Sequence, residues 1–219
     1  MHTQSATAAR RLRPVWTSSY ALALAAAMFI PAATAMAVDI VRVEEDWELV
    51  VGDPDESTNS PQVTCVTSSS GGIDGHYAAL TINHKTLPDF EPGGLQLQVW
   101  DGTGAVGSSK FPKDDELGSG DTVSWTLSMR VEGGQLHFEV TQGNSATWGS
   151  LGGQGYLRQT VASNLTNLNG YSPAVSVENS GVGYAGNRVT SLRLKAVRAY
   201  SAEGLVAEDN SPKSIFPHE

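Results

Sequence analysis

Apolar and polar residues alternate along most of the chain from residue 38 onward. The clearest run extends from Val123 to Val131, where every second residue is apolar. A period of two is typical of a strand with one face in a core and the other in water. Comparable runs occupy residues 47–51, 62–67, 78–83, 95–100, 136–141, 174–178 and 188–200. The pattern therefore predicts a series of short strands.

Turn-forming residues separate these runs, and no run has the period of an amphipathic helix beyond one possible turn at residues 161–168. Many short strands with one polar face predict an all-β fold, an antiparallel two-sheet β-sandwich or jelly roll, over residues 38–200. The apolar phase slips between Leu194 and Val197, which predicts a β-bulge there. Residues 201–219 lose the pattern and are predicted to form a loosely ordered tail.

One predicted hairpin allows two registers. Keeping Met129 and Leu136 on the same side of the sheet requires an even-length loop. In one register His137 pairs with Ser128, and in the other it pairs with Arg130. Both registers place Arg130, His137 and Glu139 on one polar face.

Residues 1–37 have the three parts of a secretory signal peptide. Arginines at 10, 11 and 13 precede an apolar run at 21–30, and Ala35-Met36-Ala37 is a small-x-small cleavage site. The alternative, an uncleaved membrane anchor, requires about 20 continuous apolar residues, roughly twice what is present. We therefore expect a secreted protein that begins at Val38.

Composition and charge exclude several classes of protein. The single cysteine, Cys65, rules out an intrachain disulfide, and we expect it to be buried as a small apolar residue. The net charge of -9 becomes -12 after signal removal, which disfavours a nucleic-acid partner. Acidic residues cluster at 44–46, 53–56 and 114–116. We interpret these clusters mainly as solvated loops, with no cofactor predicted and a structural calcium ion as the alternative.

Two pairs of polar-side residues are candidates for binding a ligand. Alternation places Gln98 with Trp100, whose ring could stack on the apolar face of a sugar. His137 and Glu139 offer polar contacts from the hairpin. Trp148 is a weaker candidate in a glycine-rich loop, whereas Trp47 and Trp125 share the apolar phase of their strands and are predicted to be core.

Catalytic motifs are missing from the sequence. A glycosidase needs two carboxyl groups flanking the bond, and the strand-borne candidates are Glu48, Glu139 and Glu178. Glu139 has the best context, but its own strand supplies no second carboxylate. The histidines at 76, 84 and 137 lack the spacing of metal ligands. No catalytic or metal-binding residue is therefore assigned.

A resemblance to a known superfamily emerges from three segments in the second half of the chain. They are VSWTLSMRVEGGQLHFEV at 123–140, NSATWGS at 144–150 and YSPAVSVENSGVGYAGNRVTSLRLKAVRAY at 171–200. Their order resembles the second half of a concanavalin A-like lectin/glucanase β-sandwich, and similar phrases occur in exported bacterial proteins without assigned activity. The resemblance implies either sugar binding or glucanase activity. The glucanases carry an E-x-D-x-x-E strand, which this sequence lacks.

Three functions follow from these observations. The first is a secreted noncatalytic module that binds a glycan or another cell-surface ligand through Gln98, Trp100, His137 and Glu139. The second is a glycoside hydrolase or lyase that uses Glu139 with an unidentified partner. The third is a structural or adhesive envelope protein. None of the three involves nucleic acid, or the membrane after signal cleavage.

Overall fold

The fold is an all-β sandwich, described by a computed structural model for residues 38–52, 62–83, 94–112, 117–153, 155–184 and 188–217. The elements, in chain order, are β1 Arg42–Val51, β2 Gln62–Ser68, β3 Tyr77–Asn83, β4 Gly94–Asp101, β5 Gly104–Pro112, β6 Thr122–Glu132, β7 Gln135–Ser145, β8 Gly149–Leu151, β9 Arg158–Ala162, α1 Pro173–Asn179, β10 Gly181–Tyr184, β11 Val189–Ser201, β12 Gly204–Asp209 and β13 Lys213–Phe216. The predicted signal peptide and the acidic residues at 53–56 and 114–116 lie outside the described ranges. Within those ranges, no helix has the length and apolar character needed to span a bilayer.

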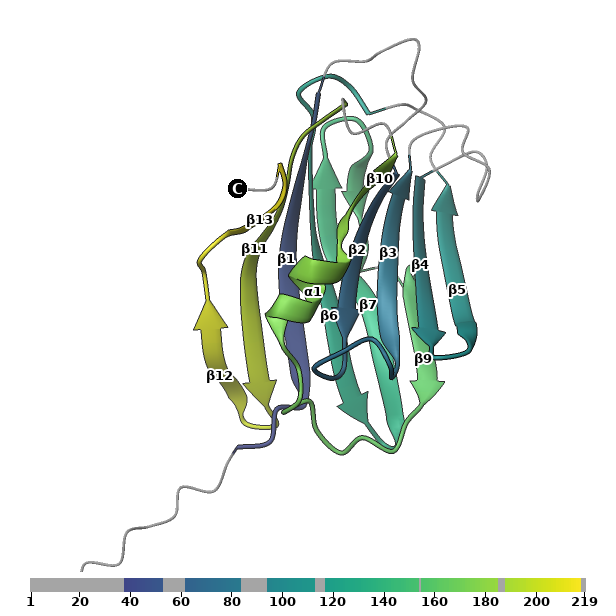
Figure 1. Cartoon of the computed structure of the whole chain (residues 1–219), viewed down its shortest axis with the longest axis vertical. Coiled ribbons are helices and arrows are strands. Elements are labelled where there is room, and N and C mark those ends of the chain that lie inside the picture. The colour runs from purple at the N-terminus through teal and green to yellow at the C-terminus, as the bar shows by residue number, and fades with distance from the viewer. Residues whose placement is uncertain are drawn as a thin grey trace, which may run out of the picture. The chain divides into compact units, whose positions relative to one another are not determined.

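The strands form two antiparallel sheets that pack face to face (Figure 1). The eight-stranded sheet has the order β12-β11-β1-β6-β7-β8, with β13 also paired to β11 and β9 also paired to β7. The five-stranded sheet has the order β10-β2-β3-β4-β5. The predicted fold class, an antiparallel two-sheet sandwich, is confirmed.

The core lies between the sheets and contains the apolar phase of the long strands β1, β6, β7 and β11 and of β2, β3 and β4. Trp47 and Trp125 are paired residues on β1 and β6, and their rings stack at a centroid distance of 6.3 Å. Both are buried, as predicted, and so is Cys65. Burial, and then the nearby Glu45 carboxyl, raise the pKa of the Cys65 thiol well above its ordinary value, which disfavours the thiolate form.

The β6–β7 hairpin adopts the second of its two predicted registers. Arg130 pairs with His137, and the turn consists of Gly133 and Gly134. Both glycines have positive φ, 58° and 75°, as a two-residue turn that matches strand twist requires. The predicted polar face with Arg130, His137 and Glu139 on one side of the sheet is therefore present.

The predicted strand at residues 174–178 is wrong, because this segment forms helix α1. Its apolar residues alternate as in a strand, but Pro173 occupies the first helical turn, where its missing N–H is tolerated. Val175 and Ser176 are buried, and Ser176 bonds to a core carboxyl on β1. Tertiary contact therefore decides the conformation of this segment.

The predicted loose tail after Tyr200 is also corrected. Residues 204–209 and 213–216 form β12 and β13, and both pair with β11. Backbone pairing with β11 holds this segment at the sheet edge, so it needs no alternating apolar face. Its sequence is therefore mostly polar. Ile215 is the exception, since it is buried in the core. The structure also adds strands β5, β8, β9 and β10, which are too short or too polar to show a clear period.

Candidate functional site

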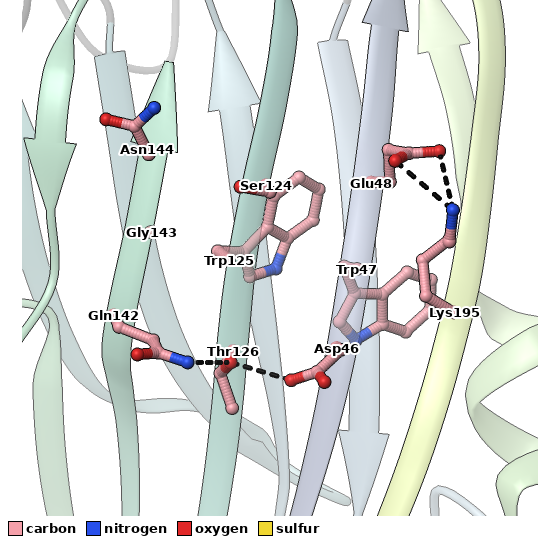
Figure 2. Close-up of a pocket in the computed structure, with 10 residues that line it drawn as sticks. All are labelled: Asp46, Trp47, Glu48, Ser124, Trp125, Thr126, Gln142, Gly143, Asn144 and Lys195. Atoms are coloured by element: carbon pink, nitrogen blue, oxygen red, sulfur yellow. Dashed lines mark hydrogen bonds and ion pairs between the residues drawn. The ribbon is translucent and has the colours of Figure 1, made fainter. Parts of the chain in front are cut away.

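A pocket of about 400 Å³ lies on the outer face of the eight-stranded sheet. We call it the central pocket (Figure 2). Its lining residues come from β11, β1, β6 and β7: Asp46, Trp47, Glu48, Ser124, Trp125, Thr126, Gln142, Gly143, Asn144 and Lys195.

Strand register explains why these polar side chains meet. Asp46 pairs with Thr126, which pairs with Gln142. In the next outward row, Glu48 pairs with Ser124, which in turn pairs with Asn144. Residues directly opposite one another share a face of the sheet. Two consecutive rows of polar side chains therefore form the floor of the central pocket.

Two β-bulges complete the pocket. On β11, Ala196 pairs with Asp46 and Leu194 pairs with Trp47, so Lys195 between them is the extra residue of a bulge. This confirms the predicted bulge between Leu194 and Val197. The ammonium of Lys195 contacts both carboxylate oxygens of Glu48, at 3.2 and 3.3 Å. On β7, Thr141 is the extra residue. This second bulge reverses the phase of the strand, so that Gln142 and Asn144 face outward.

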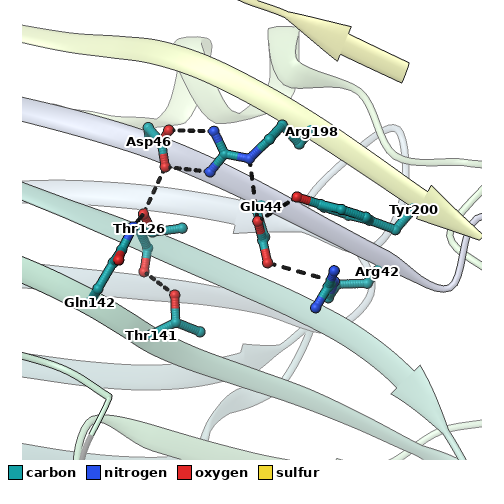
Figure 3. A network of polar contacts seen from close by, with 8 residues as sticks. All are labelled: Arg42, Glu44, Asp46, Thr126, Thr141, Gln142, Arg198 and Tyr200. Atoms are coloured by element: carbon teal, nitrogen blue, oxygen red, sulfur yellow. Dashed lines mark hydrogen bonds and ion pairs between the residues drawn. The ribbon is translucent and has the colours of Figure 1, made fainter. Parts of the chain in front are cut away.

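A continuous polar network runs along the pocket floor and beyond it (Figure 3). The Gln142 amide donates to Thr126 Oγ1 at 3.2 Å, and the Thr126 hydroxyl donates to Asp46 at 2.7 Å. Arg198 holds the Asp46 carboxylate with two donors, at 2.6 and 2.8 Å. Despite partial burial, these bonds keep the pKa of Asp46 below its ordinary value. Asp46 is therefore ionised and fixed in place at neutral pH.

The four predicted contact residues lie on two different sheets. Gln98 and Trp100 are half-buried on the outer side of β4, in the five-stranded sheet. His137 and Glu139 are half-buried on the outer side of β7, in the eight-stranded sheet. The outer faces of a sandwich point away from each other, so the structure does not gather Trp100 and Glu139 into one groove. Only His137 and Glu139 share a face with the central pocket.

The other residues that the sequence offered as candidates lie in the core, on the helix or within a strand. Trp148 belongs to the buried core, which agrees with the favoured interpretation of its ring as part of the core edge and excludes the alternative of a loop-borne sugar contact. Glu178 is exposed on α1 rather than on a strand. Residues 44–46, interpreted as part of a solvated loop, lie in β1, and Glu45 is fully buried. In the parts of the chain that the structure describes, no group of three or more His, Cys, Asp or Glu side chains is placed to hold a metal ion.

No protein-family model matches this sequence, and a search of curated proteins finds no match. The functional argument therefore depends on the geometry of the site itself.

The central pocket had one signal in the sequence. Glu44, Asp46 and Glu48 occupy alternate positions and so share one face of a strand. Their neighbours Gln142 and Asn144 could not be assigned to that face, because the bulge at Thr141 depends on pairing with β6. Lys195 lies at the bulge of β11. The sequence predicted that bulge, but it did not show that β11 pairs with β1 and so brings Lys195 to Glu48.

Proposed function

We propose that the protein is a secreted, noncatalytic β-sandwich that binds a glycan in the central pocket. The observation that carries the proposal is the pocket itself, a hollow whose lining combines Trp47 and Trp125 with carboxylate, amide, hydroxyl and ammonium groups held on rigid strands. Such groups donate to and accept from sugar hydroxyls in a fixed geometry. The fold-level resemblance to concanavalin A-like lectins and glucanases agrees with this class of ligand, although fold alone carries no function.

Binding is favoured over hydrolysis by the state of the carboxyl groups. Asp46 and Glu48 lie two residues apart on β1, so their Cα atoms are separated by roughly 6.6 Å. That spacing makes a glycoside hydrolase the second candidate, since two carboxyl groups in one pocket are the minimum that the reaction needs. A general acid, however, must be protonated and have a raised pKa. The pKa of Asp46 is lowered, and Glu48 is ion-paired to Lys195.

A structural or adhesive role is less well supported. That role predicts a flat polar face, whereas the eight-stranded sheet has a hollow of about 400 Å³. Gln98 and Trp100 remain a predicted contact surface on the other sheet, independent of the central pocket.

The test is a glycan array probed with the mature protein, with hydrolysis of each bound glycan monitored by chromatography. Gln142→Ala and Asn144→Ala are the variants, because both side chains are exposed and neither lies in the core. We expect each substitution to weaken binding about 5- to 20-fold, the value of one or two hydrogen bonds. The control is Gln135→Ala, an exposed residue at the other end of β7.

The outcomes separate the candidate functions. Binding without turnover that depends on Gln142 and Asn144 supports the proposal. Turnover that is lost in Asp46→Asn or Glu48→Gln supports the hydrolase. No binding to any glycan contradicts both.

A further inference from the structure

A row of outward-facing side chains crosses five strands at one end of the eight-stranded sheet. Arg42 on β1 is paired with Tyr200 on β11 and with Arg130 on β6. Arg130 is paired with His137 on β7, which is paired with Thr160 on β9. We call these five residues the basic row. Two of the five, Arg42 and Arg130, are positively charged and none is an acid, in a chain whose net charge is -9.

The basic row borders a second hollow, of about 340 Å³. Its lining includes Arg42, Arg130 and Tyr200, and it also includes residues 201–204, of which Glu203 is an acid. The guanidinium of Arg42 lies over the ring of Tyr200, 3.9 Å from its centroid. This stacking fixes the plane of the guanidinium while leaving its edge available to a ligand.

Arg42 and Arg130 are direct cross-strand partners, and like charges in that position repel each other. Their side chains are 40% and 39% exposed. Arg130 pairs with Glu132, and Arg42 lies 3.6 Å from Glu44. Each arginine therefore has one carboxylate neighbour, and the Arg42–Glu44 contact is the longer of the two (Figure 3). An anion between the two arginines would relieve their repulsion.

Carboxylates also lie near the basic row: Glu132 pairs with Arg130, Glu203 lines the hollow, and Glu44 is shared among several donors. The Glu44 carboxylate accepts hydrogen bonds from Arg198, at 3.3 Å, and from the Tyr200 hydroxyl, at 2.9 Å. The state of His137 agrees with a positive local field. Its pKa is lowered by partial burial and then by the charges of Arg130 and Arg158, which together outweigh the opposing effects of Glu132 and Glu139.

We propose that the basic row binds the anionic group of an acidic glycan, a carboxylate or a sulfate, while a neighbouring part of the same chain occupies the central pocket. This inference rests on the proposed function and names its ligand class. Arg42 and Asp46 are four residues apart on β1, or roughly 13 Å, so one oligosaccharide can reach both sites.

The test compares acidic polymers with their neutral counterparts by isothermal titration calorimetry on the mature protein. Polygalacturonate against its methyl ester tests the carboxylate, and dextran sulfate against dextran tests the sulfate. We expect the acidic member of at least one pair to bind about tenfold or more tightly, and its affinity to fall as salt is raised. Arg130→Gln should remove most of that difference, whereas Arg130→Lys should keep part of it.

Arg193→Gln is the matched control, because it removes the same charge from an exposed site opposite Glu48. It should leave the preference for the acidic polymer intact, and thermal melts of all variants establish that they are folded. Equal binding of acidic and neutral polymers, or equal loss in Arg193→Gln and Arg130→Gln, overturns the inference while leaving glycan binding in place. Failure of every polymer, together with a silent glycan array, overturns both proposals.

Discussion

Glu45 is a buried carboxyl group that accepts several hydrogen bonds inside the core. It is fully buried on β1 and accepts hydrogen bonds from Trp47 Nε1 at 3.1 Å, Tyr171 OH at 2.8 Å and Ser176 Oγ at 2.5 Å. Thr67 on β2 is a fourth hydrogen-bond partner. Because these partners belong to both sheets and to α1, the carboxyl group ties three parts of the fold together.

Replacing Glu45 tests this role. Glu45→Leu leaves the donors of Trp47, Tyr171 and Ser176 buried without an acceptor, and we expect it to lower the free energy of unfolding by about 3 kcal/mol or more. Glu45→Gln keeps an acceptor and should cost much less. Urea denaturation at neutral pH measures both. Equal losses in the two variants would contradict a hydrogen-bonding role.

The difference in stability between the wild type and Glu45→Gln should depend on pH, and the direction follows from the pKa of Glu45. Burial raises the pKa of Glu45, and the hydrogen bonds offset this only in part. A raised folded pKa stabilises the protein fully below the ordinary pKa of the group, and that stability is lost as the pH rises through the folded value. The Gln side chain in Glu45→Gln cannot ionise. The free energy of unfolding of this variant should therefore rise relative to that of the wild type as the pH is raised from 4 to 8. A constant difference across this range would contradict the assignment.

At the scale of the element, the C-terminal segment is part of the sheet and not an appendage. β13 pairs with β11 and places Ile215, which is 1% exposed, in the core. On β12, by contrast, Leu205 is 53% exposed. The two strands therefore differ in what they contribute to stability, although both extend the same sheet edge.

Alanine substitutions distinguish these contributions. Ile215→Ala should lower the free energy of unfolding by about 2 to 4 kcal/mol, because it leaves a cavity in a packed core. Leu205→Ala, the matched control, should stay within about 0.5 kcal/mol of the wild type. Chemical denaturation of the two variants decides the point. A negligible effect at Ile215 would restore the interpretation of this segment as a loose tail.

At the scale of the whole molecule, the two outer faces of the sandwich have different roles in our proposals. The eight-stranded sheet has the central pocket and the basic row on one surface, so both proposed contacts address the same ligand. The five-stranded sheet carries Gln98 and Trp100, which cannot contribute to that site. A binding defect in Trp100→Ala would therefore report a separate surface.

Secretion is the remaining prediction at this scale. Cleavage after Ala37 would leave four residues before β1 begins at Arg42, and it would keep the bond from the Ile40 amide to Asn169 Oδ1, at 2.8 Å. We expect N-terminal sequencing of exported protein to start at Val38. Exported material that starts at Met1 would contradict cleavage and favour the uncleaved membrane anchor.

The sequence alone determined the sandwich, because a period of two with glycine-rich turns leaves few alternatives to antiparallel sheets. It also determined which residues face the core in 47–51 of β1, in β6, and in β7 as far as Val140, and it narrowed the hairpin to two registers. Those inferences depend on the alternation of apolar and polar residues, which can be read from neighbouring positions in the sequence.

Only the tertiary structure decided what depends on contacts between distant segments. The helix at 173–179, the strands after Tyr200 and the bulge at Thr141 are fixed by pairing and burial, which the local pattern does not encode. The same holds for the site: Asp46, Gln142 and Lys195 are far apart in the chain and meet because of strand order and register. Local periodicity thus determines which face a side chain takes, whereas long-range pairing decides which side chains become neighbours.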